Sequence, residues 1–133
     1  MFEGCCNFNS DLSGWNVSKA KDMYKMFYNC HNFNSDLSRW DVSNVEDMAK
    51  MFYDCHKFTS DLSRWNVSSC CDFKKMFYNC RLFTSDLSRW NVSNCGNKKS
   101  FYNGNCVSFG FSEMFYRCKN FNSDLKDWDV SNV

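Results

Sequence analysis

The chain is 133 residues long, which is enough for one domain with a substantial hydrophobic core. Its charge is balanced, with sixteen Lys and Arg residues against fifteen Asp and Glu residues and a formal net charge of +1. This balance excludes the sequence-independent attraction to nucleic acid or anionic membrane that a strongly basic chain has. Because no stretch approaches about eighteen consecutive apolar residues, we also expect no membrane insertion.

A 25-residue unit recurs along the chain. Met, Phe, Leu and Trp each return at this interval, and the units start near Met1, Met26, Met51, Met76 and Met114. The step from Trp90 to Trp128 is 38 residues, so the array is interrupted once. We interpret Ser100–Glu113 as a degenerate unit that has lost its Leu–Trp half. Residues 1–133 are therefore predicted to form a single repeat array.

The first predicted element of each unit is a helix of two to three turns, as in residues 44–57. From Met48 to Cys55 the apolar residues are spaced i, i+3, i+4 and i+7, which is typical of the buried face of a helix. Ser43 and Glu46 match a capping box at its start. The neighbouring units keep the same apolar spacing.

The next predicted elements are a turn and a short strand. The segment FTSDLS is rich in residues that bond to their own backbone and favour turns. In the segment RWNVS, Trp65 and Val67 alternate with Arg64 and Asn66, which indicates a strand with one buried face.

One helix and one strand in each unit predict an α/β repeat solenoid of the leucine-rich-repeat type, with a unit length in the usual range of roughly 20–29 residues. The short strands would stack as a parallel sheet at about 4.8 Å, whereas helices need roughly 8–10 Å between their axes. We therefore expect a curved stack with the strands on its concave side.

The pattern MFxxCxxFxxDLSxWxVSxVxxM resembles the BspA-like bacterial surface-protein repeat family. The resemblance covers almost the whole chain except Cys95–Glu113, although the LxxLxLxxN core of ordinary leucine-rich repeats is absent. It implies a right-handed leucine-rich-repeat-like solenoid and a cell-surface or extracellular setting in bacteria and protists, with relatives in some large DNA viruses. It also implies adhesion and protein binding, and it supplies no catalytic residues.

The phase of the array predicts that this chain is a fragment. It opens on the Met column and stops at WDVSNV, partway through a unit. Neither end carries the atypical polar unit that covers the terminal core of a solenoid. We expect a piece of a longer array, or an array whose ends are covered by something else.

The cysteines are predicted to be mostly buried free thiols, because one in each unit lies on the apolar face of the expected helix: Cys5, Cys30, Cys55, Cys80 and Cys118. A bridge between Cys70 and Cys95 remains an alternative if their column lies close to the sheet. We expect no zinc site, since there is no CxxC pair and only His31 and His56 could join one.

The aspartates of the SDLS segments form a further column: Asp11, Asp36, Asp61, Asp86 and Asp124. Stacked carboxylates could hold calcium. The alternative, which the absence of a glycine-rich calcium turn favours, is that each carboxylate caps its own turn.

The candidate partner-binding residues lie on the outward side of the predicted strands. Arg39, Arg64 and Arg89 would stand in register, and they are flanked by Asp41, Asn66 and Asn91. Like charges directly opposite each other on a sheet are unfavourable, so each Arg is expected to pair with the Asp three residues before it. The alternative is a surface that binds carboxylates of a protein partner.

Two further columns have alternative interpretations. The tyrosines that follow the helix Phe are expected to stack on one another, or else to form an adhesive outer stripe: Tyr28, Tyr53, Tyr78, Tyr102 and Tyr116. The sequons at Asn16, Asn66 and Asn91 are interpreted as by-products of the repeat, since their Val is expected to be buried.

The sequence predicts a protein without enzymatic activity, because a repeated unit offers no unique cleft and no catalytic set recurs. We expect no cofactor and no small-molecule substrate. The first hypothesis is a scaffold for protein–protein binding or adhesion that is extracellular or displayed at a cell surface. The alternative is a structural building block of a larger assembly, such as a filament, a surface layer or a virus particle, in which neighbouring copies are the partners.

Overall fold

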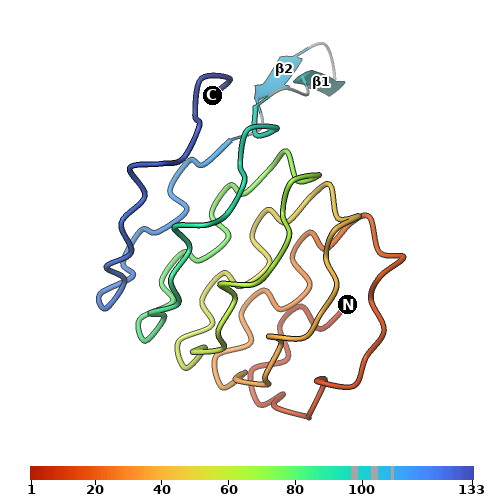
Figure 1. The fold of residues 1–133 in the computed structure, drawn as a ribbon. Helices are drawn as coiled ribbons and strands as arrows, with labels where there is room; N and C mark the ends of the chain where they lie inside the picture. Colours follow the sequence, from red (N-terminus) through yellow and green to blue (C-terminus); the bar gives the residue numbers. More distant parts are fainter. Residues whose placement is uncertain (97–98, 103–104, 109) are drawn as a thin grey trace.

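The computed structural model describes residues 1–96, 99–102, 105–108 and 110–133, with side chains for 1–96 and 110–133. The 25-residue units form coils that stack side by side in sequence order (Figure 1). We number the coils by the Met at which each unit starts, from Met1 for the first to Met114 for the fifth. None of the described residues forms a helix long and apolar enough to cross a membrane.

The prediction of an α/β leucine-rich-repeat-like solenoid is wrong. The described residues contain no helix, and their only strands are β1 (Lys99–Tyr102) and β2 (Asn105–Ser108). The coils themselves consist of turns and extended links, with isolated parallel bridges that join Asp22 to Asp47 and Asp47 to Asp72.

Residues 44–57 form consecutive turns in place of the expected helix. The backbone N–H of Met51 bonds to the carbonyl of Met48, three residues back, where a helix would reach four. Lys50, the third residue of this turn, has a φ of 57°, as a type II turn requires. Met48 and Met51 are nevertheless fully buried, because a chain of turns can place these positions on one face as a helix does.

From Met48 to Asp54, every second N–H group bonds to the next coil. Met48 donates to the carbonyl of Asp72, Lys50 to that of Lys74, and Phe52 to that of Met76, over 2.8–3.0 Å. Alternate N–H groups thus stay within a turn or cross to the neighbouring coil. This alternation satisfies the buried backbone without a regular helix or strand.

The segment RWNVS is not a strand, although its predicted burial is correct. Trp65 and Val67 are buried, and each takes part in a turn: the N–H of Trp65 bonds to the carbonyl of Leu62, and that of Cys70 to the carbonyl of Val67. The indole Nε1 of Trp65 donates to the carbonyl of Leu37 in the preceding coil at 2.9 Å. Side chains therefore connect the coils here where a parallel sheet was expected.

The core is a set of aromatic columns that run through the stack. Phe27, Phe52 and Phe77 stack with ring centroids 5.7 Å apart, and a second Phe column runs beside them. Offset stacking at such distances adds about 0.5–1.5 kcal/mol for each pair to the free energy of burying the rings. Each coil therefore depends on its neighbours for its core.

The coils lie closer together on one side of the stack than on the other. The ring centroids of Tyr53 and Tyr78 are 4.4 Å apart, whereas those of Trp65 and Trp90 are 6.4 Å apart. Backbone hydrogen bonds join the coils near the Tyr column, and side chains act as spacers near the Trp column. The coils therefore fan apart on the Trp side, which was expected to be concave.

The stretch Ser100–Glu113 does not form the single degenerate unit that the sequence predicted. Strands β1 and β2 pair antiparallel as a hairpin, whereas residues 110–113 already belong to the fifth coil. The fifth coil stacks directly on the fourth, since Phe77 lies 5.8 Å from Phe115 and Trp90 lies 6.4 Å from Trp128. The interruption of the repeat between Trp90 and Trp128 therefore does not separate the fourth coil from the fifth.

Candidate functional site

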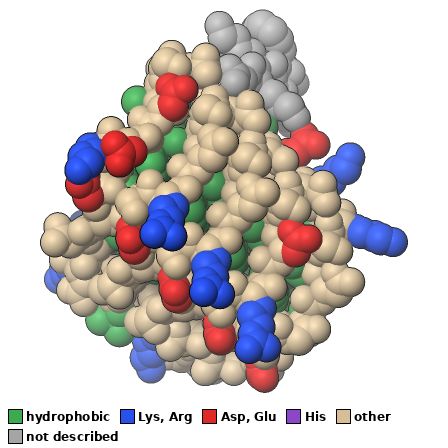
Figure 2. Space-filling model, viewed as in Figure 1, with side chains coloured by type: hydrophobic (Ala, Val, Ile, Leu, Met, Phe, Trp, Pro, Cys, Tyr) green, Lys and Arg blue, Asp and Glu red, His purple; other side chains and the backbone are tan. Residues whose placement is uncertain are grey.

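The predicted partner-binding arginines lie on one face of the stack. Arg39, Arg64 and Arg89 are exposed and occupy the same position in successive coils. Figure 2 shows a diagonal row of basic side chains across this face, each close to an acidic side chain. The register that the repeat predicted is therefore present, although it is built on turns.

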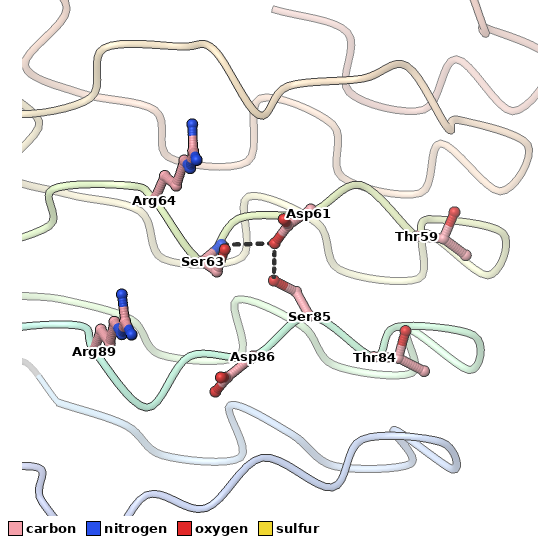
Figure 3. Close-up of a pocket in the computed structure, with 8 residues that line it drawn as sticks. All are labelled: Thr59, Asp61, Ser63, Arg64, Thr84, Ser85, Asp86 and Arg89. Carbon is pink, nitrogen blue, oxygen red and sulfur yellow. Dashed lines mark hydrogen bonds between the residues drawn. The ribbon is translucent and has the colours of Figure 1, made fainter.

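A polar groove of about 480 Å³ lies between the third and fourth coils on this face. Arg64 and Arg89 stand at one end of it and point the same way, while the other end is lined by threonines (Figure 3). Its lining consists of Thr59, Asp61, Ser63, Arg64, Thr84, Ser85, Asp86 and Arg89. The groove thus brings together two of the predicted residues and offers guanidinium and hydroxyl groups to a partner.

The aspartates of this face cap turns and connect the coils. Asp61 accepts hydrogen bonds from the N–H of Ser63 at 2.9 Å and from the hydroxyl of Ser85 in the next coil at 3.1 Å. These bonds hold the pKa of Asp61 below its usual value. The capping interpretation describes the geometry of the whole column, since Asp11, Asp36, Asp86 and Asp124 bond in the same way within their turns.

No described ion pair within 4 Å joins Arg39, Arg64 or Arg89 to a carboxylate. The predicted pairing of each Arg with the Asp three residues before it is therefore present only as a longer-range attraction. The N–H of Ser38 has the largest effect in lowering the pKa of Asp36, and Arg39 contributes less.

Asp41, Asn66 and Asn91, the predicted flanking residues, are exposed but already bind their own turns. Asn66 Oδ1 accepts from both the N–H and the hydroxyl of Ser68, and Asp41 and Asn91 repeat this arrangement. These oxygens support the turn beside each Arg. These three residues lie next to the Arg row, but they are not the principal groups with which it would contact a partner.

The described cysteines that were predicted to be buried form a hydrogen-bonded column. The thiol of Cys55 donates to the carbonyl of Phe27 at 3.1 Å, and Cys30, Cys80 and Cys118 make the equivalent bond. Burial raises the pKa of Cys30 and Cys118 to about 11, which keeps these thiols protonated. Cys70 and Cys95 are also free, so the alternative of a bridge between them is not realised, and Cys5 is exposed.

The tyrosines stack as predicted. Tyr28, Tyr53 and Tyr78 have centroids 4.4–4.7 Å apart, and Tyr116 continues the column at 4.8 Å. The side chain of Tyr102 lies outside the described residues.

Sequence reasoning missed a cluster on the tightly spaced side of the stack. His31, Asp54 and His56 each offer a ligand atom, and these atoms all lie within 4.8 Å of one another. The two imidazole rings stack at 4.7 Å with an interplanar angle of 4°. The available signal was the presence of His at the same position of two successive units.

Comparisons with known proteins yield one family. The model described as "Mycoplasma protein of unknown function, DUF285" matches residues 1–109 and again residues 107–133. No curated protein matches the chain. No solved structure matches it either.

Proposed function

We propose that this chain, which belongs to the family described as Mycoplasma protein of unknown function, DUF285, is a non-enzymatic scaffold that binds proteins at a cell surface. Its BspA-like pattern supports this proposal, because that repeat family is associated with adhesion. The setting is extracellular or surface-displayed. Protease treatment of intact cells that carry the full-length protein tests the location: an exposed array is degraded, and an array inside the cell is not.

The proposed binding surface is the Arg row together with the groove beside it. The observation that carries this assignment is the exposure of Arg39, Arg64 and Arg89 in register without a described ion pair. Arginine is enriched in protein interfaces because its planar guanidinium binds carboxylates through two hydrogen bonds. The preferred partner is therefore a protein segment with carboxylates spaced to match successive coils.

A labelled hexaglutamate peptide tests this surface, with binding measured at low ionic strength. Replacing Arg39, Arg64 and Arg89 by Gln is expected to weaken binding at least about tenfold, since exposed ion pairs contribute about 0.2–1 kcal/mol each and three are removed together. The matched control replaces three exposed lysines elsewhere, Lys19, Lys57 and Lys119, by Gln and removes the same charge. Equal losses in the two variants would mean that net charge alone attracts the peptide, and the assignment would fail.

A structural building block of a larger assembly is the second candidate. It is favoured by an apolar groove of about 300 Å³ on the first coil, where Trp15 is 43% exposed. A further coil that stacked on this groove, from the same chain or from another copy, would bury Trp15 as Trp40 is buried. Sedimentation at rising protein concentration tests this candidate: self-association that Trp15→Arg abolishes supports it, and a monomer at all concentrations rejects it.

A further inference from the structure

We propose that His31, Asp54 and His56 bind one divalent transition-metal ion of the zinc class between the second and third coils. This site is separate from the Arg face, and it departs from the sequence-based expectation of no zinc site. Two imidazoles and one carboxylate form a ligand set that such ions prefer, with positions left open for water.

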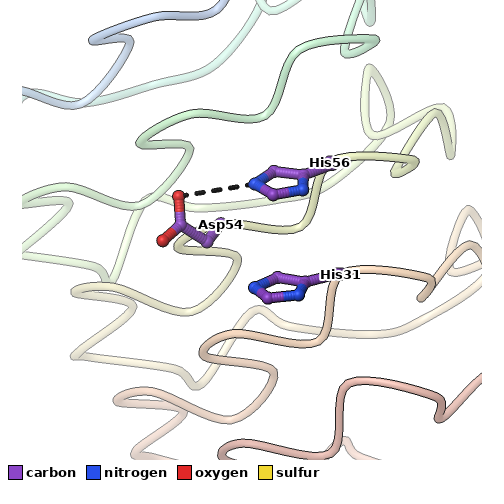
Figure 4. Close-up of side chains that lie close together, drawn as sticks. All are labelled: His31, Asp54 and His56. Carbon is purple, nitrogen blue, oxygen red and sulfur yellow. Dashed lines mark ion pairs between the residues drawn. The ribbon is translucent and has the colours of Figure 1, made fainter.

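The placement of the three side chains carries the proposal. The rings of His31 and His56 lie one above the other, and Asp54 points toward the same edge of both rings (Figure 4). Asp54 Oδ1 is 3.7 Å from Nε2 of His56. The backbone positions that present these groups are held by the hydrogen bonds between coils, such as that from the N–H of Asn29 to the carbonyl of Tyr53.

Small side-chain movements would complete the site. Metal–nitrogen distances of about 2.0–2.1 Å at a tetrahedral angle require ligand atoms about 3.3 Å apart. The three ligand atoms already lie within 4.8 Å of one another. All three side chains are only partly buried, so their rings and carboxylate can rotate toward a common point.

The side-chain amide of Asn79 already occupies the point toward which lone pairs of Asp54 and His56 are directed. Nδ2 of Asn79 lies 2.7 Å from Asp54 Oδ1 and 3.2 Å from Nε2 of His56. Because Nδ2 can only donate, Nε2 of His56 acts as an acceptor and is the unprotonated nitrogen that a metal requires. A bound ion would take over these two hydrogen bonds.

Two neighbouring groups bear on the affinity. Arg81 occupies the His position of the next coil, and its positive charge opposes a cation. Asn29 occupies the Asp54 position of the coil below, and its Oδ1 is buried without a hydrogen-bond partner.

Titration of the protein with Zn²⁺ tests the proposal, with isothermal calorimetry as the readout. The background carries Cys5→Ser and Cys6→Ser, because these exposed thiols would also bind zinc. We expect one equivalent to bind, and His31→Arg, His56→Arg and Asp54→Asn each to weaken it at least about tenfold. A Co²⁺ spectrum without thiolate charge-transfer bands provides an independent check on the ligands.

Each substitution has a precedent in this chain, which makes folding of the variants expected. Arg occurs in the His column at Arg81, and Asn occurs in the Asp54 column at Asn29 and Asn79. Asp41→Asn on the Arg face is the matched control and should leave zinc binding unchanged. The absence of binding, or equal affinity in both His variants and the parent, would overturn the proposal.

Discussion

Most polar side chains of the repeat bind backbone groups, and many of these groups belong to the next coil. The hydroxyl of Ser60 accepts the N–H of Leu37 at 2.9 Å, and the indole of Trp65 donates to the carbonyl of the same Leu. A buried backbone group left without a partner costs about 1–3 kcal/mol. The need to satisfy these backbone groups therefore explains why Ser and Trp recur at fixed positions of the repeat.

One polar column differs, because its members are carboxylates that the stacking of the coils brings close to one another. Asp22, Asp47 and Asp72 are joined by parallel bridges, and burial together with the charges of Asp72 and Asp22 raises the pKa of Asp47 to about 6. The N–H of Ala49 donates to Asp47 Oδ1 at 2.8 Å and works against this rise. Asp47 therefore carries an unfavourable charge at neutral pH.

We predict that Asp47→Asn is more stable than the parent at neutral pH. A raised folded-state pKa means that the parent gains stability as the pH falls through about 6 toward the unfolded-state value of about 3.9. The advantage of the variant should therefore shrink, by on the order of 1–2 kcal/mol, between about pH 7.5 and about pH 4.5. Urea unfolding of both proteins at each pH measures this difference.

Burial also lowers the pKa of His56, but this imidazole is present in both proteins and its contribution cancels in the comparison. Asp41→Asn is the control. The bonds from Ser43 hold the pKa of Asp41 below its usual value, so its carboxylate stays charged across this range and the difference from the parent should stay flat. A flat difference for Asp47→Asn as well would contradict the argument.

At the scale of elements, residues in the left-handed region determine the path of each coil. Lys25, Lys50, Lys75 and Glu113 share one such position, and Asn29, Asp54, Asn79 and Arg117 share the next, with φ between 53° and 59°. Each is the third residue of a turn, four positions from the other. A non-glycine residue in this region costs roughly 1–2 kcal/mol. In the first four coils the N–H of each such residue binds a carbonyl of the next coil, which offsets this cost: Lys25, Asn29, Lys50, Asp54, Lys75 and Asn79.

A glycine substitution distinguishes between this turn and the helix that the apolar spacing predicted. Arg117→Gly should leave the free energy of unfolding unchanged or raise it by up to about 1 kcal/mol, because glycine adopts positive φ without strain. Lys57→Gly, at an exposed position where φ is not positive, should lower it by about 0.5–1 kcal/mol. Thermal unfolding measures both.

The lost contact between Arg117 and the ring of Tyr116, at 5.3 Å, is exposed and is expected to contribute only about 0.5 kcal/mol. A helical segment would give the opposite pattern for Arg117, since glycine within a helix costs about 1 kcal/mol. Equal losses in the two variants would therefore reject the description of 113–118 as consecutive turns.

At the scale of the whole molecule, stability comes from stacking of coils, and the interruption after Gly96 does not break the contact between the fourth and fifth coils. The N–H of Gly96 bonds to the carbonyl of Cys71, and the N–H of Phe73 bonds to the carbonyl of Gly110. These bonds are equivalent to those that Cys71 and Met48 make with their neighbouring coils. Gly96 and Gly110 thus occupy adjacent positions of one uninterrupted repeat.

We predict that the chain folds without residues 97–109. Joining Gly96 to Gly110 restores the 25-residue interval between Trp90 and Trp128 and retains every described column. The free energy of unfolding should change by no more than about 1 kcal/mol, since only loop entropy and the hairpin are removed. Circular dichroism and urea unfolding measure the outcome.

Removal of the equally long stretch 59–71 is the control, because it deletes Leu62 and Trp65 from the core and should abolish cooperative unfolding. If the protein without 97–109 behaves like this control, the hairpin is part of the folding unit and the prediction is wrong.

The sequence predicted the burial of the columns far better than their backbone. The 25-residue interval correctly placed Phe52, Cys55, Leu62 and Trp65 inside, because identical units that stack must place identical residues in register. It failed on the helix because the spacing of buried residues is shared by a helix and by consecutive turns. It failed on the strand because alternation of Trp65 and Val67 records burial and not hydrogen bonding.

By itself, then, the sequence determined the repeat, its register, the buried columns and the exposed Arg row. Tertiary structure decided the rest, because the deciding hydrogen bonds join residues about one repeat apart. It decided the turn conformation of each coil, the adjacency of Phe77 and Phe115 across the interruption, and the meeting of His31 with Asp54 and His56. The last of these depends on which neighbouring coil presents its side chains at the same edge, and local patterns carry no information about that.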